Sequence, residues 1–340
     1  TWTDFHYYSV QRGMQQIDYE MHRDIANLFF AKMKAMSSSE PANSFRQSLK
    51  SDDTEEPIDI KFYRPLGYRI AKAAQRLHIT PNNITIASIF LGVAGGILFF
   101  PSSLKWNCLG MLLLIAANSL DSADGQLARL TNNHTRLGRI LDGLAGELWF
   151  ITIYVSICLR LYIGGYGWWI WLLGAVAGAC HILHAAMADY YRNIHMYFLL
   201  GKDKAELDSQ AKIKEEMNSM KWMSKDWFHK LYLYFYARYT GSQEAQVKSF
   251  HKMMQRLEEK YGDNIPADIR ENFCRESRPV MPLTNIINFD TRVAVLFLSI
   301  GFGIPWFYFV FESTILEAVR FYVTGRHERL CERIMEQYTD

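Results

Sequence analysis

The stretch Asn118–Glu147, NSLDSADGQLARLTNNHTRLGRILDGLAGE, decides which fold and chemistry we expect of this chain. It places Asp121, Asp124 and Asp142 at the ends of two hydrophobic runs. Ionised side chains in or beside a bilayer are costly, so they indicate a functional site. Helical spacing puts Asp121 and Asp124 on one face, and Asp142 opens the next helix. Two neighbouring helices would therefore direct three carboxylates into one pocket, which suits Mg²⁺ or Mn²⁺.

This stretch resembles the signature of the CDP-alcohol phosphotransferase family, also called CDP-alcohol phosphatidyltransferases. The signature runs Asp, two residues, Asp-Gly, two residues, Ala-Arg, eight residues, Gly, three residues, Asp, three residues, Asp. Its elements stand at the expected spacing at Asp121, Asp124, Gly125, Ala128, Arg129, Gly138 and Asp142. The last position holds Gly146 in place of the final Asp.

The resemblance implies an enzyme in which an alcohol attacks the β-phosphoryl group of a CDP-linked donor and releases CMP. The metal ligands that it implies are Asp121, Asp124 and Asp142, with Mg²⁺ or Mn²⁺ as the cofactor. The nucleotide- and diphosphate-binding residues that it implies are Gly125, Ala128, Arg129 and Gly138. We also expect Gly138 to let the two helices of the motif pack closely, because small residues permit close helix approach.

The missing carboxylate at Gly146 bears directly on the mechanism. In the family the final Asp is the general base and a metal ligand, and glycine can do neither. Glu147 is the nearest replacement base, although one residue further along a helix lies about 100° round its axis. Four explanations fit: another base, substrates that need a base less, an engineered inactivating change, or a non-catalytic relative.

The composition indicates a membrane protein with a large polar portion. The chain has 340 residues, is 49% hydrophobic and carries a formal net charge of +2, which argues against a nucleic-acid-binding protein. A mean hydropathy of −0.10 hides a division. Residues 84–189 and 282–324 are strongly apolar, whereas 1–80 and 190–281 are polar. The apolar blocks supply about six runs of the roughly 20 residues that a transmembrane helix needs.

The expected fold is therefore an all-α integral membrane bundle of about six transmembrane helices, with an interfacial amphipathic helix and extra cytoplasmic helices. We place the spans at 84–100, 106–130, 138–162, 166–190, 282–300 and 305–324. The domains expected are an N-terminal extension at 1–60, the interfacial helix at 61–79, spans one to four at 80–190, a helical insertion at 191–281, spans five and six at 282–324, and a tail at 325–340.

The two segments before the first span have different patterns. Residues 1–34 hold a helical candidate, and the polar residues 36–57 are typical of a linker. Residues 61–79 are amphipathic, with Leu66, Ile70 and Leu77 on one face and basic side chains beside them. That pattern is typical of a helix lying in the membrane interface.

The distribution of basic residues predicts the orientation. Nearly all Lys and Arg fall in 1–83, 131–139, 190–281 and 325–340. The positive-inside rule places these segments, the N-terminus and the Asp motif on the cytoplasmic side, which would be the cytoplasmic face of the inner or plasma membrane in a bacterium. An aromatic cluster in the insertion fits packing of a small helical subdomain, membrane-interface contact, a dimer contact or a lid.

Further polar residues are candidates for head-group or phosphate contacts: Arg136, Arg139, His181, His184, Arg292, Glu317 and Arg320. Ordinary structural roles compete with these. The histidines fit buried hydrogen-bonded partners, Glu317 and Arg320 are spaced to pair with each other, and the first two arginines fit positive-inside anchors. The five cysteines have neither disulfide nor zinc-site spacing.

We expect a phosphotransferase of lipid head-group synthesis, with an inositol phospholipid or phosphosphingolipid product favoured. Its partners would be a CDP-linked lipid or alcohol donor, a polar alcohol or lipid acceptor and membrane lipids, without nucleic acid. Small residues in the spans suit a homodimer. The alternative is a catalytically weak relative that binds nucleotide or lipid as a scaffold. A transporter is disfavoured because no inverted repeat is visible.

Overall fold

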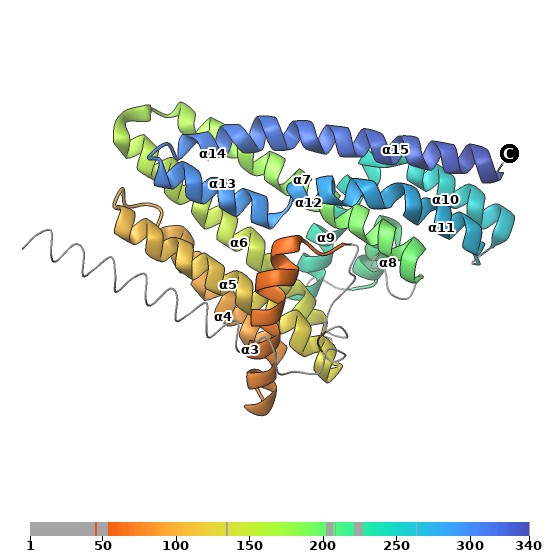
Figure 1. Ribbon diagram of the computed structural model, residues 1–340, viewed down its shortest axis with the longest axis horizontal. Coiled ribbons are helices and arrows are strands. Elements are labelled where there is room, and N and C mark those ends of the chain that lie inside the picture. Colours follow the sequence, from red (N-terminus) through yellow and green to blue (C-terminus); the bar gives the residue numbers. More distant parts are fainter. Residues whose placement is uncertain are drawn as a thin grey trace, which may run out of the picture. The chain divides into compact units, whose positions relative to one another are not determined.

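A computed structural model describes residue 45 and residues 54–339, apart from 134, 202–206, 208, 221–226 and 263. The helix and most of the linker expected within 1–57 lie outside the described residues. Everything below concerns the compact unit that spans Leu49–Asp340. Its regular structure, over the residues described, is helical throughout, which confirms the all-α fold (Figure 1).

The α-helices are α3 Arg64–Arg76, α4 Pro81–Ile97, α5 Leu104–Thr131, α6 Arg136–Leu161, α7 Trp169–Leu200, α8 Gln210–Ser219, α9 Trp227–Gln246, α10 Lys248–Tyr261, α11 Ala267–Ser277, α12 Met281–Ile286, α13 Phe289–Gly301, α14 Trp306–Phe311 and α15 Glu317–Thr339. Turns of π-helix precede α3 (Asp59–Tyr63), follow α6 (Tyr162–Tyr166) and join α14 to α15 (Glu312–Leu316).

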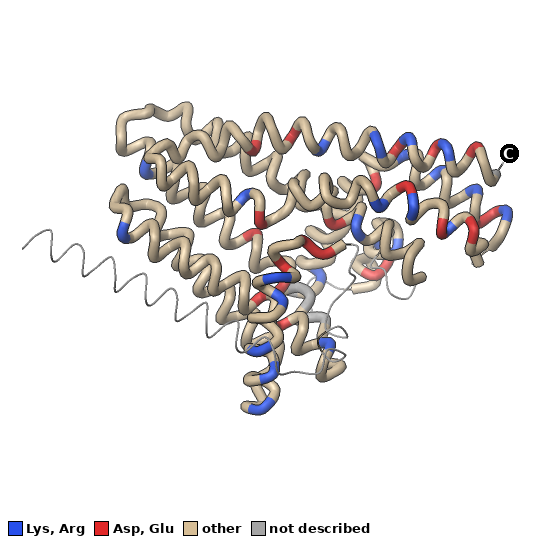
Figure 2. Tube along the Cα trace, viewed as in Figure 1, with Lys and Arg blue, Asp and Glu red and all other residues tan. Residues whose placement is uncertain are grey.

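The structure contains helices of membrane-spanning length, but it does not confirm the predicted number of six spans. Three described helical segments are long and apolar enough to cross a membrane: Leu141–Tyr166, Trp169–Leu200 and Ala267–Gly301. The apolar helix Pro81–Ile97 is shorter. Charged residues are sparse along α4 to α7 and α13 to α14 and denser where α10, α11 and the end of α15 lie together (Figure 2).

Three predicted segments differ from the structure. Helix α7 continues past the predicted end at 190 to Leu200, where Gly201 with φ of 97° ends it. Helix α15 continues to Thr339 through the predicted tail 325–340. The fifth predicted span is split between α12 and α13 at Asn288, whose extended backbone precedes α13.

Helix α4 packs against both α5 and α6 through its glycines. A Cβ atom on Gly95 would lie 2.9 Å from the carbonyl oxygen of Gly110, and one on Gly110 would lie 2.8 Å from that of Gly95. Gly138 of α6 likewise packs against Asn82 at the start of α4, where a Cβ would come within 2.7 Å of the amide oxygen. The close contact of the motif region is therefore with α4, and not between spans two and three as expected.

We predict that Gly95→Val destabilises the protein by about 1–3 kcal/mol, because an added side chain must push apart a backbone-to-backbone helix crossing. Thermal unfolding in detergent measures the effect. Gly178→Val is the matched control, since a Cβ there meets nothing within 4 Å. Equal shifts in Tm for the two variants would contradict this account of the α4–α5 crossing.

Helix α3 is amphipathic as predicted, and it holds the preceding turn against α5. Tyr68, Ala71 and Ala74 are buried on its inner side, whereas Leu77 is 70% exposed. The side-chain amide of Gln126 donates to the carbonyl oxygen of Arg64 at 3.1 Å. These contacts place the start of α3 beside the Asp motif; the interfacial position of the helix stays a prediction.

One apolar core surrounds Trp149, Phe150 and Ile153 of α6. A second apolar core lies between the end of α7, helices α10 and α11, and α15. The rings of Phe198 and Phe273 stack there with centroids 3.9 Å apart. In the insertion, the rings of Tyr232 and Tyr236 stack on each other with centroids 5.4 Å apart. Both residues pack against the small core of α8 and α9, which supports packing of a helical subdomain. Phe235 is exposed.

Candidate active site

A cavity of about 390 Å³ lies among the segment before α3, helices α5, α6 and α7, and the start of α13. The charged side chains that line it are Glu55, Glu56, Asp59, Arg64, Asp121, Arg129, Asp142, Glu147, Asp189, Arg192, Asp290 and Arg292. A polar cavity between apolar helices gives charged ligands access to a membrane protein's interior.

Two of the motif carboxylates, Asp121 and Asp142, line this cavity, and the third, Asp124, lies beside them. Oxygens of Asp121, Asp124 and Asp142 all lie within 4.8 Å of one another. Asp124 is only 4% exposed and accepts a hydrogen bond from the hydroxyl of Thr85 on α4. That hydroxyl also contacts the carbonyl oxygen of Pro81 at 3.1 Å. The packing of α4 thus fixes the most buried of the three.

This group fits the divalent metal that the family resemblance implies. It offers three carboxylates from two helices, close enough for each to supply an oxygen to one cation. Hard oxygen ligands of this kind suit Mg²⁺, which is typically held by one or two carboxylates together with substrate phosphates. A second set of ligands is not required for that chemistry.

The other motif positions divide into two sets. Gly125 and Arg129 line the cavity, whereas Ala128 is not among its lining residues. Gly138 lies in the first turn of α6, where its amide donates to the hydroxyl of Thr135 at 2.9 Å. The side chains of Arg136 and Arg139 lie outside the described residues.

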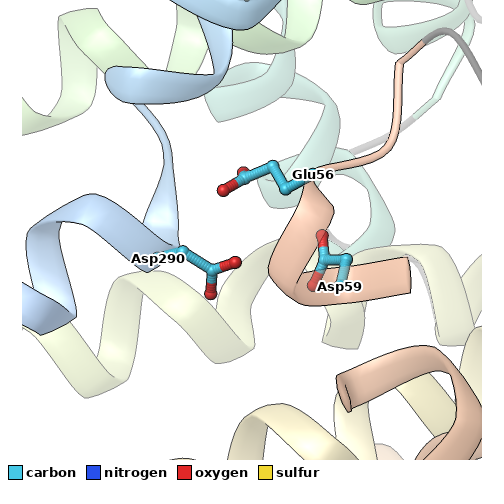
Figure 3. A group of neighbouring side chains, drawn as sticks. All are labelled: Glu56, Asp59 and Asp290. Carbon is cyan, nitrogen blue, oxygen red and sulfur yellow. The ribbon is translucent and has the colours of Figure 1, made fainter. Parts of the chain in front are cut away.

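A second group of carboxylates lines the same cavity and was missed at the level of sequence. Oxygens of Glu56, Asp59 and Asp290 lie within 4.8 Å of one another. Figure 3 shows Glu56 and Asp59 on the segment before α3 and Asp290 on α13, with the carboxyl groups of Glu56 and Asp290 turned toward the same space. Among the described residues, this group and the group of Asp121, Asp124 and Asp142 are the ones whose oxygens are close enough together to hold a metal ion.

One signal in the sequence could have found this group. Asp290 lies in the middle of the predicted span 282–300, where an acidic residue is unusual. The members of this group are far apart along the chain. Asn288, which donates a hydrogen bond to Glu56, is separated from Glu56 by 232 residues. The polar composition of residues 36–57 is typical of a linker and gives no sign that Glu56 is buried.

Glu56 has a strongly shifted pKa. Burial raises the pKa of Glu56 from 4.5 to about 8, the negative charges of Asp290 and Asp59 add to the shift, and the Asn288 amide opposes it. At neutral pH the carboxyl group therefore holds its proton for most of the time.

This shift predicts how stability depends on pH. Because the pKa of Glu56 is higher in the folded protein, protonation of Glu56 favours folding, and this stability is fully present below pH 4.5 and lost as pH rises through about 8. Glu56→Gln should therefore flatten the decline of the unfolding free energy between pH 5 and 8. Unfolding curves across this range, with Glu258→Gln as the control, measure it. Parallel curves for wild type and Glu56→Gln would contradict the shift.

Positive side chains share the cavity with the two carboxylate groups. Arg64, Arg129, Arg192 and Arg292 all line it. Arg64 forms an ion pair with Glu55 at 2.8 Å and lies 3.5 Å from the hydroxyl of Ser122. Arginine suits bidentate contacts to phosphate, so these residues can hold a diphosphate or a second anionic group.

His181 and Arg292 line the cavity and connect it to a buried acid. Arg292 contacts the ring of His181, donates to the carbonyl oxygen of Ile287 at 2.9 Å, and its Nε lies 3.7 Å from Glu312. Glu312 is fully buried and accepts a hydrogen bond from the hydroxyl of Tyr308 at 2.9 Å.

The remaining candidates lie behind this layer and do not line the cavity. His184 contacts Glu317 at 2.8 Å. Glu317 pairs with Arg320, as the spacing predicted, and Arg320 donates to Gln246 of α9 at 2.6 Å. These three residues therefore have structural partners that connect α7 and α15 to the insertion.

Glu147 and Gly146 both line the cavity. A Cβ atom built on Gly146 meets nothing within 4 Å, so the position faces open space. Glu147 is half-buried, and the charge of Arg292 acts on it.

Comparison with known proteins agrees with the motif. Residues 78–206 match the sequence model of the CDP-alcohol phosphatidyltransferase family. A CDP-diacylglycerol–serine O-phosphatidyltransferase of Helicobacter pylori is 35% identical over 88 residues, which are 26% of this chain and 35% of that protein. A phosphatidylinositol phosphate synthase of Mycolicibacterium smegmatis is 33% identical over 87 residues, or 25% of this chain and 38% of that protein. The chain thus spans a little over a third of these relatives' length.

Proposed function

We propose, from the membership of residues 78–206 in the CDP-alcohol phosphatidyltransferase family, that the chain is a membrane phosphotransferase of lipid head-group synthesis. It would move a phospho-alcohol unit between a CDP-linked donor and an alcohol acceptor. The observation that carries the proposal is the convergence of Asp121, Asp124 and Asp142 on a cavity lined by arginines.

The residues take the following roles in this proposal. Asp121, Asp124 and Asp142 would hold Mg²⁺ or Mn²⁺, which supplies charge neutralisation for the donor diphosphate when bound. Arg129 contacts the diphosphate from α5. Gly125 leaves room for the nucleotide, since the absence of a side chain permits close approach.

The cavity also suggests the class of acceptor. Three arginines line it in addition to Arg129 of the motif: Arg64, Arg192 and Arg292. A phosphorylated polyol such as an inositol phosphate would place its phosphate against one of these arginines, a contact that an uncharged alcohol cannot make. We therefore propose an inositol-type product first and a phosphosphingolipid second. The cytoplasmic position of the site and a homodimer stay predictions.

The test is a transfer assay with the purified full chain in lipid nanodiscs. CDP-diacylglycerol is offered with inositol phosphate, inositol, serine or a ceramide, in Mg²⁺, Mn²⁺ or EDTA, and CMP and lipid products are measured by mass spectrometry. We expect CMP release that requires both an acceptor and a divalent cation. Binding of the CDP-lipid without CMP release from any combination would favour the scaffold alternative.

A further inference from the structure

The place where the family carries its last carboxylate is open in this protein. Gly146 lines the cavity, and a Cβ atom there would meet nothing within 4 Å. Reaction of an alcohol with a phosphoryl group is helped by a base that takes the hydroxyl proton. The cavity therefore has room for an acceptor beside Gly146, and a side chain at another position has to take the hydroxyl proton.

The second carboxylate group comes from outside the matched family region. Glu56 and Asp59 precede residues 78–206, and Asp290 follows them, yet all three line the same cavity as Asp121 and Asp142.

Ring contacts place the start of α13 against the helix that carries Gly146. The ring of Phe289, next to Asp290, lies 6.1 Å from Trp149 and 5.9 Å from Phe150 of α6. Both contacts fall about one helical turn beyond Gly146. The start of α13, which carries Asp290, thus packs beside the turn of α6 that follows Gly146, and Asp290 and Gly146 line the same cavity.

The surroundings of Glu56 hold its carboxyl group in one place. It is 5% exposed and accepts a hydrogen bond from the Asn288 amide, while the carboxyl group of Asp290 faces it (Figure 3). Asp290 is itself 9% exposed, and its Oδ2 is buried without a hydrogen-bond partner among the described residues. A buried polar atom left unpaired is costly, which marks a place where a hydroxyl group or water would be bound.

We propose that Glu56, positioned by Asn288 and Asp290, is the general base of the transfer and replaces the carboxylate that is absent at Gly146. The inference rests on the proposed function. In this step the acceptor oxygen bonds to the β-phosphorus of the donor, and the bond from that phosphorus to the bridging oxygen of CMP breaks. The hydroxyl proton passes to the Glu56 carboxylate, and CMP leaves with the bonding electron pair.

Glu147, the replacement predicted from the sequence, is less suited to this role. Among the described residues no hydrogen bond holds the carboxyl group of Glu147, whereas the Asn288 amide holds that of Glu56. A general base has to be held within hydrogen-bond reach of the hydroxyl group from which it takes the proton. The groups that face Glu56 are Asp59 and Asp290, with Asn288 and the more distant charge of Arg192.

The surroundings of Glu56 also predict a pH profile. Because burial beside two acids raises the pKa of Glu56 to about 8, the fraction able to accept a proton grows as pH rises toward 8. The value of kcat/KM should therefore rise over this range and level off above it. Glu56→Gln should lose this rise.

The test compares Glu56→Gln, Glu147→Gln and the control Glu258→Gln, each with and without Gly146→Asp. We expect Glu56→Gln to lower kcat about a hundred-fold or more with unchanged binding of CDP-diacylglycerol. Gly146→Asp should restore at least about a tenth of the lost activity in that background, because it returns a carboxylate to the family position. Glu258→Gln should behave as wild type.

Three outcomes would overturn the inference while CMP release by the wild type upholds the proposed function. Glu56→Gln could keep its kcat and pH profile. It could lose activity together with donor binding and gain nothing from Gly146→Asp, which is the behaviour of a structural residue. Or Glu147→Gln could be the variant that loses kcat and is restored. A folded wild type that releases no CMP with any acceptor would overturn the proposed function and the inference with it.

Discussion

Asp124→Asn is expected to lower kcat at least about a thousand-fold, because it removes one of the three carboxylates that would hold the cation that neutralises the charge of the donor diphosphate. Asp124 is the most buried of the three and keeps its hydrogen bond from Thr85 when replaced by the isosteric amide. CMP release measures the loss, and Mn²⁺ binding followed by electron paramagnetic resonance measures the metal separately.

Asp268→Asn on the exposed side of α11 is the control for this prediction. It removes one negative charge from the same protein, far along the chain from the motif, and should leave both CMP release and Mn²⁺ binding unchanged. An Asp124→Asn protein with more than about a tenth of wild-type activity would show that this group does not hold the metal ion used in the reaction.

Arg292→Leu is expected to destabilise the folded protein by about 3–5 kcal/mol, because it leaves Glu312 buried without its cation. Arg292 is 1% exposed and Glu312 fully buried, so water cannot replace the lost partner. Thermal or denaturant unfolding in detergent measures the change. Arg326→Leu, at an exposed position of α15, is the control.

The double variant Arg292→Leu/Glu312→Leu separates a lost charge from lost packing. When both members of a buried pair become apolar, the protein often regains most of its stability. We therefore expect the double variant to be more stable than Arg292→Leu alone. If the two losses instead add, Glu312 is held by its histidine and tyrosine contacts, and Arg292 is not its counter-ion.

The Asp motif could be predicted from the sequence because its geometry is local. Asp121 and Asp124 share a face by helical spacing, and Asp142 lies on a neighbouring helix that begins shortly after. Helical periodicity over a few turns needs no knowledge of the rest of the fold. The contact that fixes Asp124 was harder to foresee, since Thr85 approaches it only because α4 packs against both motif helices.

The second carboxylate group, Glu56, Asp59 and Asp290, could not be predicted because its geometry is not local. It depends on how the segment before α3 lies against α13, two parts of the chain joined by no local pattern. The roles of His181 and His184 also depend on packing between distant parts of the chain. Both were equal candidates from their helical spacing, but the packing of α13 and α15 brings only His181 to the cavity.

Helix ends were the least predictable feature of the fold. Hydropathy detects where a segment leaves lipid, and α7 and α15 continue as helices beyond that point because they pack on the second apolar core. Leu330 and Ile334, on the predicted tail, are buried there. A span that becomes a core helix keeps its helical structure while its surroundings change from lipid to protein.

The most direct test of the central claim is a crystal structure of the full chain with CDP-diacylglycerol and Mn²⁺, with anomalous scattering to locate the metal. We expect Mn²⁺ at Asp121, Asp124 and Asp142, and the donor diphosphate beside Arg129 on the side of the cavity toward Glu56. Nucleotide bound elsewhere would contradict the assignment of this cavity as the site of phosphoryl transfer. Mn²⁺ found only at Glu56, Asp59 and Asp290 would contradict the assignment of the motif carboxylates as the metal ligands.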